Sequence, residues 1–378
     1  MKPIWKLAAA TAGGAAAAAL SALPASAATA EASAAPVHAV FVQTDNAAGN
    51  TIVAYLRTAD GGLQQVGSYP TGGNGGVLTG SVIDHLASEG SLAYDRQARL
   101  LYAANAGSST ITVFSVRGDA LVRSQVLSSG GQFPVSITVH GNQVFVLNAL
   151  GGASVSGFVQ SGGRLIPQPS WQRDLALGTT PATAFTGTPG QISFTPDGSH
   201  LVVTTKGAAN TVDIFQAGPA GPSANPAVTS LPGAVPFGIT FDQYGHLVIA
   251  DAGTDTVATF GIAPDGTLTQ LGSAATGQAA TCWITASPTG TLYASNAGSA
   301  TESALRTQPD GAVTLLGSTS TDAGTVDAAA SSDGQYLYVQ TGGAGIVDAY
   351  RINPDGSLTQ TGSVTVPGAA GGEGIVAP

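Results

Sequence analysis

Short segments of alternating apolar and polar residues, separated by turn residues, fill the chain from about residue 38 onward. The stretch 91–131 shows the pattern plainly, with such segments at 91–94, 100–104, 110–116 and 121–127. Period-2 alternation broken by Gly, Asn, Asp or Ser about every 8–12 residues predicts an antiparallel meander of four strands. Such a unit cannot bury its apolar face alone, so we expect further copies.

The four-strand pattern occurs seven times, and its second strand and following turn are present in every copy. These segments are VFVQTDN (40–46), LYAANAG (101–107), VFVLNAL (144–150), LVVTTKG (201–207), LVIADAG (247–253), LYASNAG (292–298) and LYVQTGG (337–343). The first strand of each copy begins at what we call its leading residue: Ser91, Ser136, Gln191, Gly238, Trp283, Asp327 or Gly374. A repeat of about 40–50 residues with four strands is typical of a β-propeller blade.

The two ends of the repeat region complement each other. The first copy begins directly at its second strand, at Val40, and the last copy leaves a spare segment, GEGIVAP (372–378). Pairing these segments completes the first blade and removes an open strand edge. We therefore predict an all-β fold, a seven-bladed β-propeller of four-stranded antiparallel blades, in which the C-terminal strand closes the N-terminal blade.

The first residues have the features of a secretory signal. Lys2 and Lys6 precede a weakly apolar run of small residues, and Ala25-Ser26-Ala27 forms an A-x-A cleavage site. A membrane anchor is the alternative, but the cleavage site favours removal and a secreted, extracellular protein. The expected organisation is a signal peptide (1–27), a flexible leader (28–37) and one propeller domain (38–378).

Charge and cysteine content narrow the possible partners. The chain has 12 basic and 22 acidic residues, and without residues 1–27 ten basic residues remain, for a net charge of −12. Such a chain has no basic surface for nucleic acid or anionic membranes, and we expect a monomer. The single cysteine, Cys282, excludes an internal disulfide, and we interpret it as a buried thiol rather than a nucleophile.

Two irregular stretches interrupt the repeat. The segment 74–90, between the first and second blades, is too long for a simple connection between strands. The stretch Arg164–Pro189 accounts for the longest spacing between leading residues, in the third blade. Insertions of this kind lie on one face of a propeller and often carry its function.

The recurring LYxxNxGSxTVxxF strand pair with P-D-G hairpins resembles the YVTN-type repeats of the lactonase-like seven-bladed propellers. That family includes 6-phosphogluconolactonase-like and carboxymuconate-cyclase-like proteins. Segments such as SEGSLAYDRQARLLYAANAGSSTITVF (88–114) and TPGQISFTPDGSHLVVTTK (188–206) are similar to its secreted actinobacterial branch. The resemblance implies a propeller that hydrolyses a lactone. The chain departs from the family at Glu89 and Thr205, and it has few basic residues for a substrate phosphate.

Acidic residues enter three blades that are neighbours around the predicted ring. Glu373 enters the first blade, Glu89 the second and Asp327 the seventh, and His85 lies in the insertion before the second. We expect these four side chains at the channel mouth as candidate catalytic residues. Crowded carboxylates raise one another's pKa, which suits a general acid and base. The same group could hold Ca²⁺ or another divalent cation, or each carboxylate could be a solvated loop residue.

A second set of positions ends the second strand of each blade: Thr44, Asn105, Asn148, Thr205, Asp251, Asn296 and Thr341. We interpret most of them as hydrogen-bond partners of the following turn. Lys206 is the basic residue beside this set and a candidate partner for an oxyanion or carboxylate. With Lys206, the candidate substrate-binding residues are Asp251, the leading residue Gln191, and Trp283, which could floor an apolar pocket.

Two functions remain open at this point. One is a secreted lactonase-like hydrolase that acts on a small cyclic ester, or a related carbohydrate-like ligand, at the channel mouth. The other is a non-catalytic extracellular binding or interaction propeller. An enzyme needs its carboxylates in one shared pocket, whereas a binding module does not.

Overall fold

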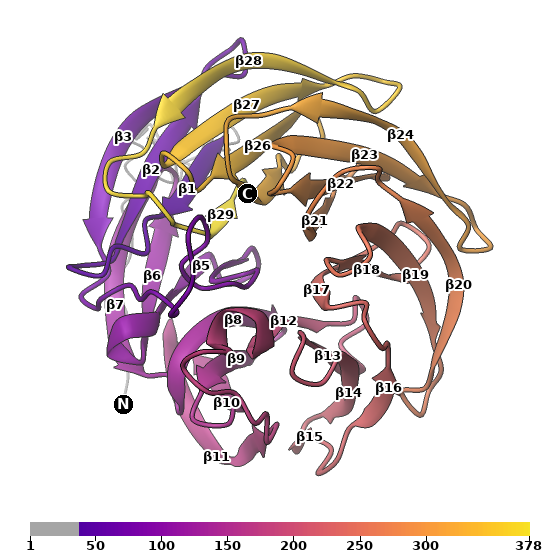
Figure 1. The fold of residues 1–378 in the computed structure, drawn as a ribbon. Coiled ribbons are helices and arrows are strands. Elements are labelled where there is room, and N and C mark those ends of the chain that lie inside the picture. The colour runs from indigo at the N-terminus through magenta and orange to yellow at the C-terminus, as the bar shows by residue number, and fades with distance from the viewer. Residues whose placement is uncertain (1–37) are drawn as a thin grey trace, which may run out of the picture. The chain divides into compact units, whose positions relative to one another are not determined.

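The computed structural model describes residues 38–378, so the predicted signal peptide and leader lie outside the described residues. The described chain forms seven antiparallel sheets arranged around a central channel, as Figure 1 shows. This confirms the predicted all-β, seven-bladed propeller. No helix within residues 38–378 is both long and apolar enough to span a membrane.

Each blade is named here by its order in the sequence, and its strands run from the channel outward. Blades 1 to 4 contain β29 (Ile375–Val376), β1 (Ala39–Gln43), β2 (Thr51–Arg57) and β3 (Leu63–Pro70); β4 (Leu92–Asp95), β5 (Leu100–Asn105), β6 (Thr110–Arg117) and β7 (Ala120–Ser128); β8 (Gln132–His140), β9 (Gln143–Leu150), β10 (Ser154–Ser161) and β11 (Arg164–Asp174); and β12 (Pro189–Phe194), β13 (His200–Thr205), β14 (Thr211–Gly218), β15 (Gly221–Pro222) and β16 (Ala227–Ser230). Blades 5 to 7 contain β17 (Pro236–Phe241), β18 (Leu247–Asp251), β19 (Thr256–Ile262) and β20 (Leu268–Ala275); β21 (Thr281–Ala286), β22 (Thr291–Asn296), β23 (Thr301–Thr307) and β24 (Val313–Ser320); and β25 (Thr325–Ala330), β26 (Tyr336–Thr341), β27 (Ile346–Ile352) and β28 (Leu358–Thr365). Within residues 38–378, two short helices, η1 (Ala106–Ser108) and α1 (Ala184–Gly187), complete the regular structure.

The ring closes as the sequence predicts. Strand β29 pairs antiparallel with β1, with Phe41 opposite Val376 and Val42 opposite Ile375. The Gln43 N–H also donates to the Gly374 carbonyl (2.8 Å). The C-terminal segment therefore supplies the inner strand of blade 1 and covers the edge of β1.

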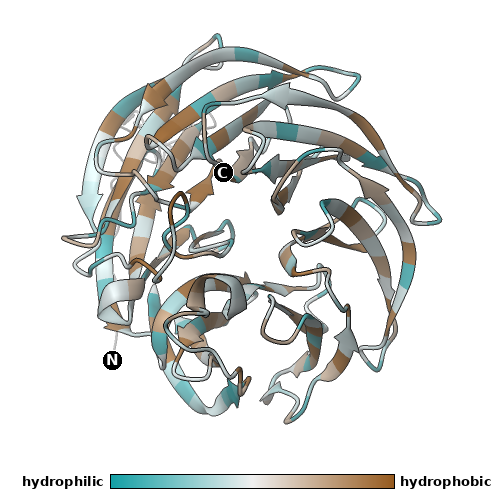
Figure 2. Ribbon diagram, viewed as in Figure 1, coloured by the Kyte–Doolittle hydropathy of each residue, from teal (hydrophilic) through white to brown (hydrophobic). Residues whose placement is uncertain are grey.

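The core lies between the blades rather than in one central volume. The middle strands are buried on both faces, and their apolar side chains form separate clusters at the contacts between neighbouring blades. The outermost strands, such as β20, consist of exposed and partly buried residues, and Figure 2 shows hydrophilic and hydrophobic residues mixed along them. In six blades the third and fourth strands are joined through a register shift, which increases the local twist.

One local expectation needs correction, and blade 4 departs from the four-strand pattern. Much of the stretch Arg164–Pro189 is not an irregular insertion, because Arg164–Asp174 forms the outer strand β11. Its Trp171 is buried and stacks on Phe145 at 5.7 Å between ring centroids. The outer part of blade 4 is in two pieces, β15 and β16, because the Gly- and Pro-rich segment 218–226 interrupts it.

Candidate functional site

The insertion 74–90 covers one end of the central channel. It contains no strand, and its backbone bonds to segments that are distant in the sequence: the His85 N–H donates to Gly371 O (2.8 Å) and the Glu89 N–H to Gly190 O (3.1 Å). The Trp283 indole N–H donates to Ser88 O (2.7 Å). Leu86 is fully buried in the apolar cluster beside blades 3 and 4. The expected open mouth on this face is therefore closed, because the insertion packs into it.

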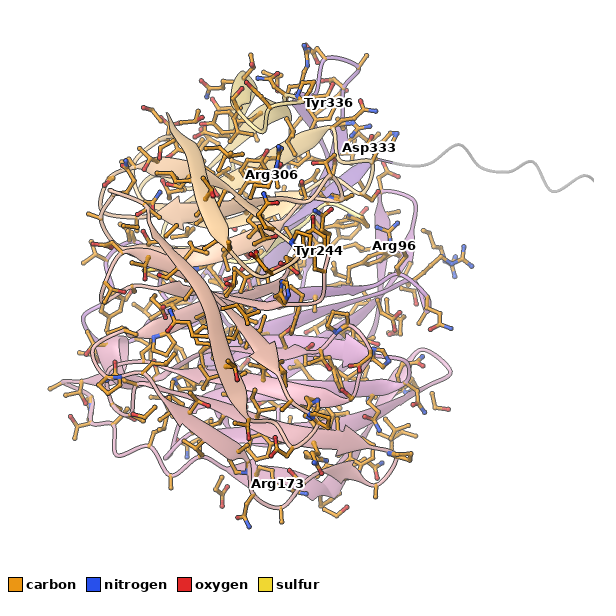
Figure 3. All side chains as sticks on the ribbon, turned by 90° about the vertical axis from the view of Figure 1, so that its right-hand side faces the viewer. Arg96, Arg173, Tyr244, Arg306, Asp333 and Tyr336 are labelled. Carbon is orange, nitrogen blue, oxygen red and sulfur yellow. The ribbon has the colours of Figure 1, made fainter. Side chains whose placement is uncertain are left out.

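A cavity of about 310 Å³ remains in the channel, between the insertion and the opposite face. Later residues of the inner strands line it, such as Ala328–Ala330 of β25, so it opens at the ends of those strands. Arg96 and Asp333 follow the inner strands β4 and β25 and therefore lie on this face; both are labelled in Figure 3. Its polar lining residues are Glu89, Gln191, Asp327, Tyr94, Thr240 and Thr285.

Irregular pairing turns the leading residues of the inner strands toward the channel. In blades 4 to 7 the inner strand shifts register around its leading residue, between Pro189 and Ile192 in blade 4 and between Thr325 and Ala328 in blade 7. A shift of this kind bends a strand and re-aims its side chains. Gln191 and Asp327 lie within these shifts and line the cavity.

Glu89 lies on a different side of the channel from the one its place in the sequence suggests. We expected it beside blades 7 and 1, but its Oε2 accepts a hydrogen bond from the backbone N–H of Ile284 in blade 6 (3.2 Å). The insertion carries Glu89 across the channel before the chain returns to blade 2. Blade 6 adjoins blade 7, so Glu89 still lies within the electrostatic field of Asp327.

The three predicted carboxyl groups are held by backbone N–H groups and influence one another. Asp327 Oδ2 accepts from the Ile375 N–H (3.2 Å), and Glu373 Oε1 accepts from the Ser91 N–H (3.1 Å). The charge of Asp327 acts on both glutamates. Glu373 is completely buried and does not line the cavity, so only Glu89 and Asp327 are in reach of a ligand there.

Burial is the main cause of the altered acidity of these groups. It raises the pKa of Asp327 to about 7, although backbone hydrogen bonds from Ile375 and Ala328 oppose this. Burial raises the pKa of Glu89 and of Glu373 well above the usual value, and the nearby Asp327 charge raises both further. Burial and the charge of Asp327 thus both favour the protonated form of Glu89, whereas Asp327 is partly ionised near pH 7.

The remaining predicted site residues do not line the cavity. The Lys206 ammonium is buried, donates to Ala87 O and lies 5.0 Å from the centre of the Phe237 ring. Burial lowers its pKa to about 8, opposed by the charge of Asp84. Trp283 is 3 % exposed and packs edge to face on Phe237, so its ring supports the insertion instead of flooring a pocket.

Asp251 and His85 also lie away from the cavity. Asp251 Oδ1 is buried without a hydrogen-bond partner among the described residues, and burial raises the pKa of this carboxyl to about 7. His85 is half-buried in the insertion, against Gly371, and burial lowers its pKa. The Cys282 thiol is buried, which raises its pKa and makes it a poor nucleophile.

Two further buried carboxyl groups were not singled out from the sequence. Asp45 accepts from the Glu373 N–H (2.8 Å), and burial raises its pKa to about 8. Glu302 accepts from the Ser295 hydroxyl (2.8 Å), and burial raises its pKa to about 8 as well. Both stand out when the blades are aligned. Asp45 and Lys206 are the charged residues at a position that is otherwise Ala or Gly, and Glu302 replaces the Ile or Val of the other six blades.

The positions that end the second strands act mainly as predicted. Asn105, for example, donates to the Thr110 hydroxyl (3.1 Å), and Thr205 accepts from the Thr211 N–H (2.9 Å). Asp251 is the exception. Within residues 38–378, no three His, Cys, Asp or Glu side chains are grouped as a metal site would require.

Known proteins resemble this chain in fold. The model of the family described as "Lactonase, 7-bladed beta-propeller" matches residues 256–373, which is about a third of the chain. No curated protein matches the sequence significantly. A putative 6-phosphogluconolactonase from Bacteroides fragilis has 19% identity and a TM-score of 0.70, covering 90% of this chain and 97% of the other.

Two other solved structures show the same architecture. The periplasmic gluconolactonase of Pseudomonas aeruginosa has 17% identity and a TM-score of 0.70, covering 90% of this chain and 98% of its own. The virginiamycin B lyase of Staphylococcus aureus has 13% identity and a TM-score of 0.55, covering 78% of this chain and 90% of its own. The chain is thus a seven-bladed propeller, and a family match to lactonase propellers covers blades 6 and 7 and part of blade 5.

Proposed function

We propose that the protein is a lactonase-type hydrolase that opens a small cyclic ester in the central cavity. The observation that carries the proposal is that Glu89 and Asp327 line one cavity, where burial raises the pKa of both and the charge of Asp327 raises that of Glu89 further. Because an ionised Asp327 opposes the ionisation of Glu89, one carboxyl group can stay protonated while the other is charged, which suits the roles of acid and base. Glu89 uses Oε2 for the Ile284 N–H, so its Oε1 remains for substrate or water, and backbone N–H groups hold the Asp327 carboxyl group at the cavity wall.

The chemistry needs one proton acceptor and one proton donor. Ionised Asp327 takes a proton from a water molecule as that water attacks the lactone carbonyl carbon. The ring C–O bond then breaks, and neutral Glu89 gives its proton to the departing ring oxygen, which yields a hydroxy acid. Gln191 Oε1 accepts from the Ile239 N–H, so its Nε2 is left to donate to the developing oxyanion.

The lining favours an uncharged substrate. No described residue that lines the cavity is Lys or Arg, so nothing there would neutralise a phosphate. Two of the similar structures bear the names gluconolactonase and putative 6-phosphogluconolactonase. Together these observations support an unphosphorylated sugar lactone as the first substrate to test. We also propose that the chain is exported, a proposal that rests on the sequence of residues 1–27.

One observation favours the competing function, a non-catalytic binding propeller. The carboxyl groups of Glu89 and Asp327 both satisfy backbone N–H groups that face the channel, which is a structural role in itself. A panel of unphosphorylated and phosphorylated lactones, assayed with and without EDTA, separates the two functions. Turnover of an unphosphorylated lactone supports the hydrolase, and no turnover of any lactone leaves the binding propeller.

A further inference from the structure

The inner strand of each blade has one edge that faces the channel and pairs with no further strand. A buried N–H group on such an edge needs an acceptor, because leaving it unpaired costs free energy. At three junctions the leading residue of the preceding blade supplies that acceptor through its side chain. The pairs are Ser136 Oγ with Ile192 N–H (3.2 Å), Gln191 Oε1 with Ile239 N–H, and Asp327 Oδ2 with Ile375 N–H (3.2 Å).

The junction between blades 5 and 6 lacks this acceptor. The leading residue of blade 5 is Gly238, which has no side chain to offer to the Ile284 N–H. Glu89 Oε2, delivered by the insertion, accepts that hydrogen bond instead. A Cβ atom on Gly238 would overlap Glu89 Oε2 and lie 2.7 Å from Cys282 O.

Space, and not backbone conformation, is the reason for glycine here. Gly238 is not among the residues with positive φ, so its backbone conformation is open to other residues. We infer that Gly238 is a positioning residue for Glu89: its missing side chain leaves the gap in which the carboxyl group of the insertion completes the hydrogen bonding of the channel wall. This hydrogen bond fixes the insertion, which leads into blade 2, to blade 6 on the opposite side of the ring.

The inference has a catalytic consequence, which rests on the proposed function. The gap at Gly238 places the Glu89 carboxyl on the wall of the cavity that Asp327 also lines. A side chain at position 238 would displace the proton donor from that wall while leaving Asp327 and Gln191 in place. Turnover would then fall through kcat more than through KM, because the substrate pocket keeps its remaining walls.

A double-mutant cycle tests the positioning role without relying on turnover. Gly238→Ser should lower the unfolding midpoint by about 2 °C or more through overlap with Glu89 Oε2 and close approach to Cys282 O, and Glu89→Ala should lower it by leaving the Ile284 N–H unpaired. In the double variant, the overlap with Glu89 is gone and the serine hydroxyl can accept from Ile284 as Ser136 does from Ile192, so the loss should be clearly smaller than the sum of the two single losses. Gly317→Ser is the matched control, because nothing lies within 4 Å of a Cβ at Gly317.

Three results would overturn the inference: additive effects of the two substitutions, a Gly238→Ser protein as stable as the parent, or an equal loss in the Gly317→Ser control. Glu89→Gln adds a conservative comparison, since its amide oxygen still accepts the Ile284 N–H and should preserve the midpoint. Reaction of the sole cysteine, Cys282, with a thiol reagent gives a second readout beside the site. It should become about tenfold faster in either single variant than in the parent or the double variant. If the parent hydrolyses no lactone, the proposed function fails, while the stability cycle still decides the role of Gly238.

Discussion

Glu89 Oε2 and the backbone N–H of Ile284 lie 3.2 Å apart, although the two residues belong to opposite sides of the propeller. The hydrogen bond joins the insertion that precedes blade 2 to the inner strand of blade 6. It places the Glu89 carboxyl group in the wall of the central cavity, where the charge of Asp327 raises its pKa. The predictions below follow from this arrangement and from the way the ring is closed.

The first prediction concerns the proposed acid and base. Glu89→Gln and Asp327→Asn keep an oxygen that can accept the backbone N–H but lose the proton chemistry. Each should lower kcat/KM for a lactone substrate by about 100-fold or more. Asp355→Asn, which changes an exposed carboxylate in a turn, serves as the control. Full activity in both site variants, with the control also unchanged, would exclude this pair from catalysis.

The second prediction concerns the pH dependence of hydrolysis. Asp327 must be ionised to act as a base, and burial raises its pKa to about 7, so kcat/KM should rise with pH through that value. At higher pH the rate should fall as Glu89 loses its proton, because burial also raises the pKa of Glu89. A bell-shaped profile in a purified-enzyme assay supports these roles. A rate that already reaches its plateau at pH 5 would contradict the role of Asp327.

The third prediction concerns stability. Glu302 is completely buried, and its pKa is raised from 4.5 to about 8, so across that window the folded chain keeps a proton that the unfolded chain has released. Its contribution to the free energy of unfolding therefore falls as pH rises through the window, by about 1.4 kcal/mol for each pH unit. Urea unfolding should give a lower stability at pH 8 than at pH 5, and Glu302→Gln should reduce that difference. An unchanged difference in the variant would contradict the burial argument.

The fourth prediction concerns ring closure. Removing residues 370–378 deletes β29 and exposes the edge of β1, where Phe41 and Val42 pair with the C-terminal strand. The truncated chain should melt at a lower temperature and aggregate more readily. Thermal melting and light scattering check this. A truncated protein that melts with the parent and stays monodisperse would show that β29 contributes little to the ring.

The fifth prediction concerns export. If the A-x-A site at Ala25–Ala27 is cleaved, N-terminal sequencing of protein recovered from culture medium should begin at or near Ala28. The control replaces Ala25 and Ala27 with large residues, which should block cleavage. Recovery of the intact Met1 terminus from a cytoplasmic fraction would overturn the proposed export.

Aligned repeats make more of the site predictable than a linear search for motifs. Asp327 and Gln191 were found because they lead their blades, and the register shift of each inner strand explains why such residues reach the channel. Glu302 could have been found as the one acidic residue at an Ile or Val position. Trp283 also leads its blade and Asp251 ends a second strand, but neither lines the cavity: the insertion covers Trp283, and Asp251 is not among the lining residues.

The sequence alone determined the number of blades, their four strands and the closure by residues 372–378. These features follow from alternation and turn residues, which are local, and from a repeat that must bury its apolar faces against copies of itself. Only the tertiary structure decided the course of 74–90, because a segment without periodicity carries no local signal of where it packs. That course set the burial of Lys206 and Trp283, the position of Glu89 across the channel, and the raised pKa of Glu89, all of which depend on contacts between residues distant in the chain.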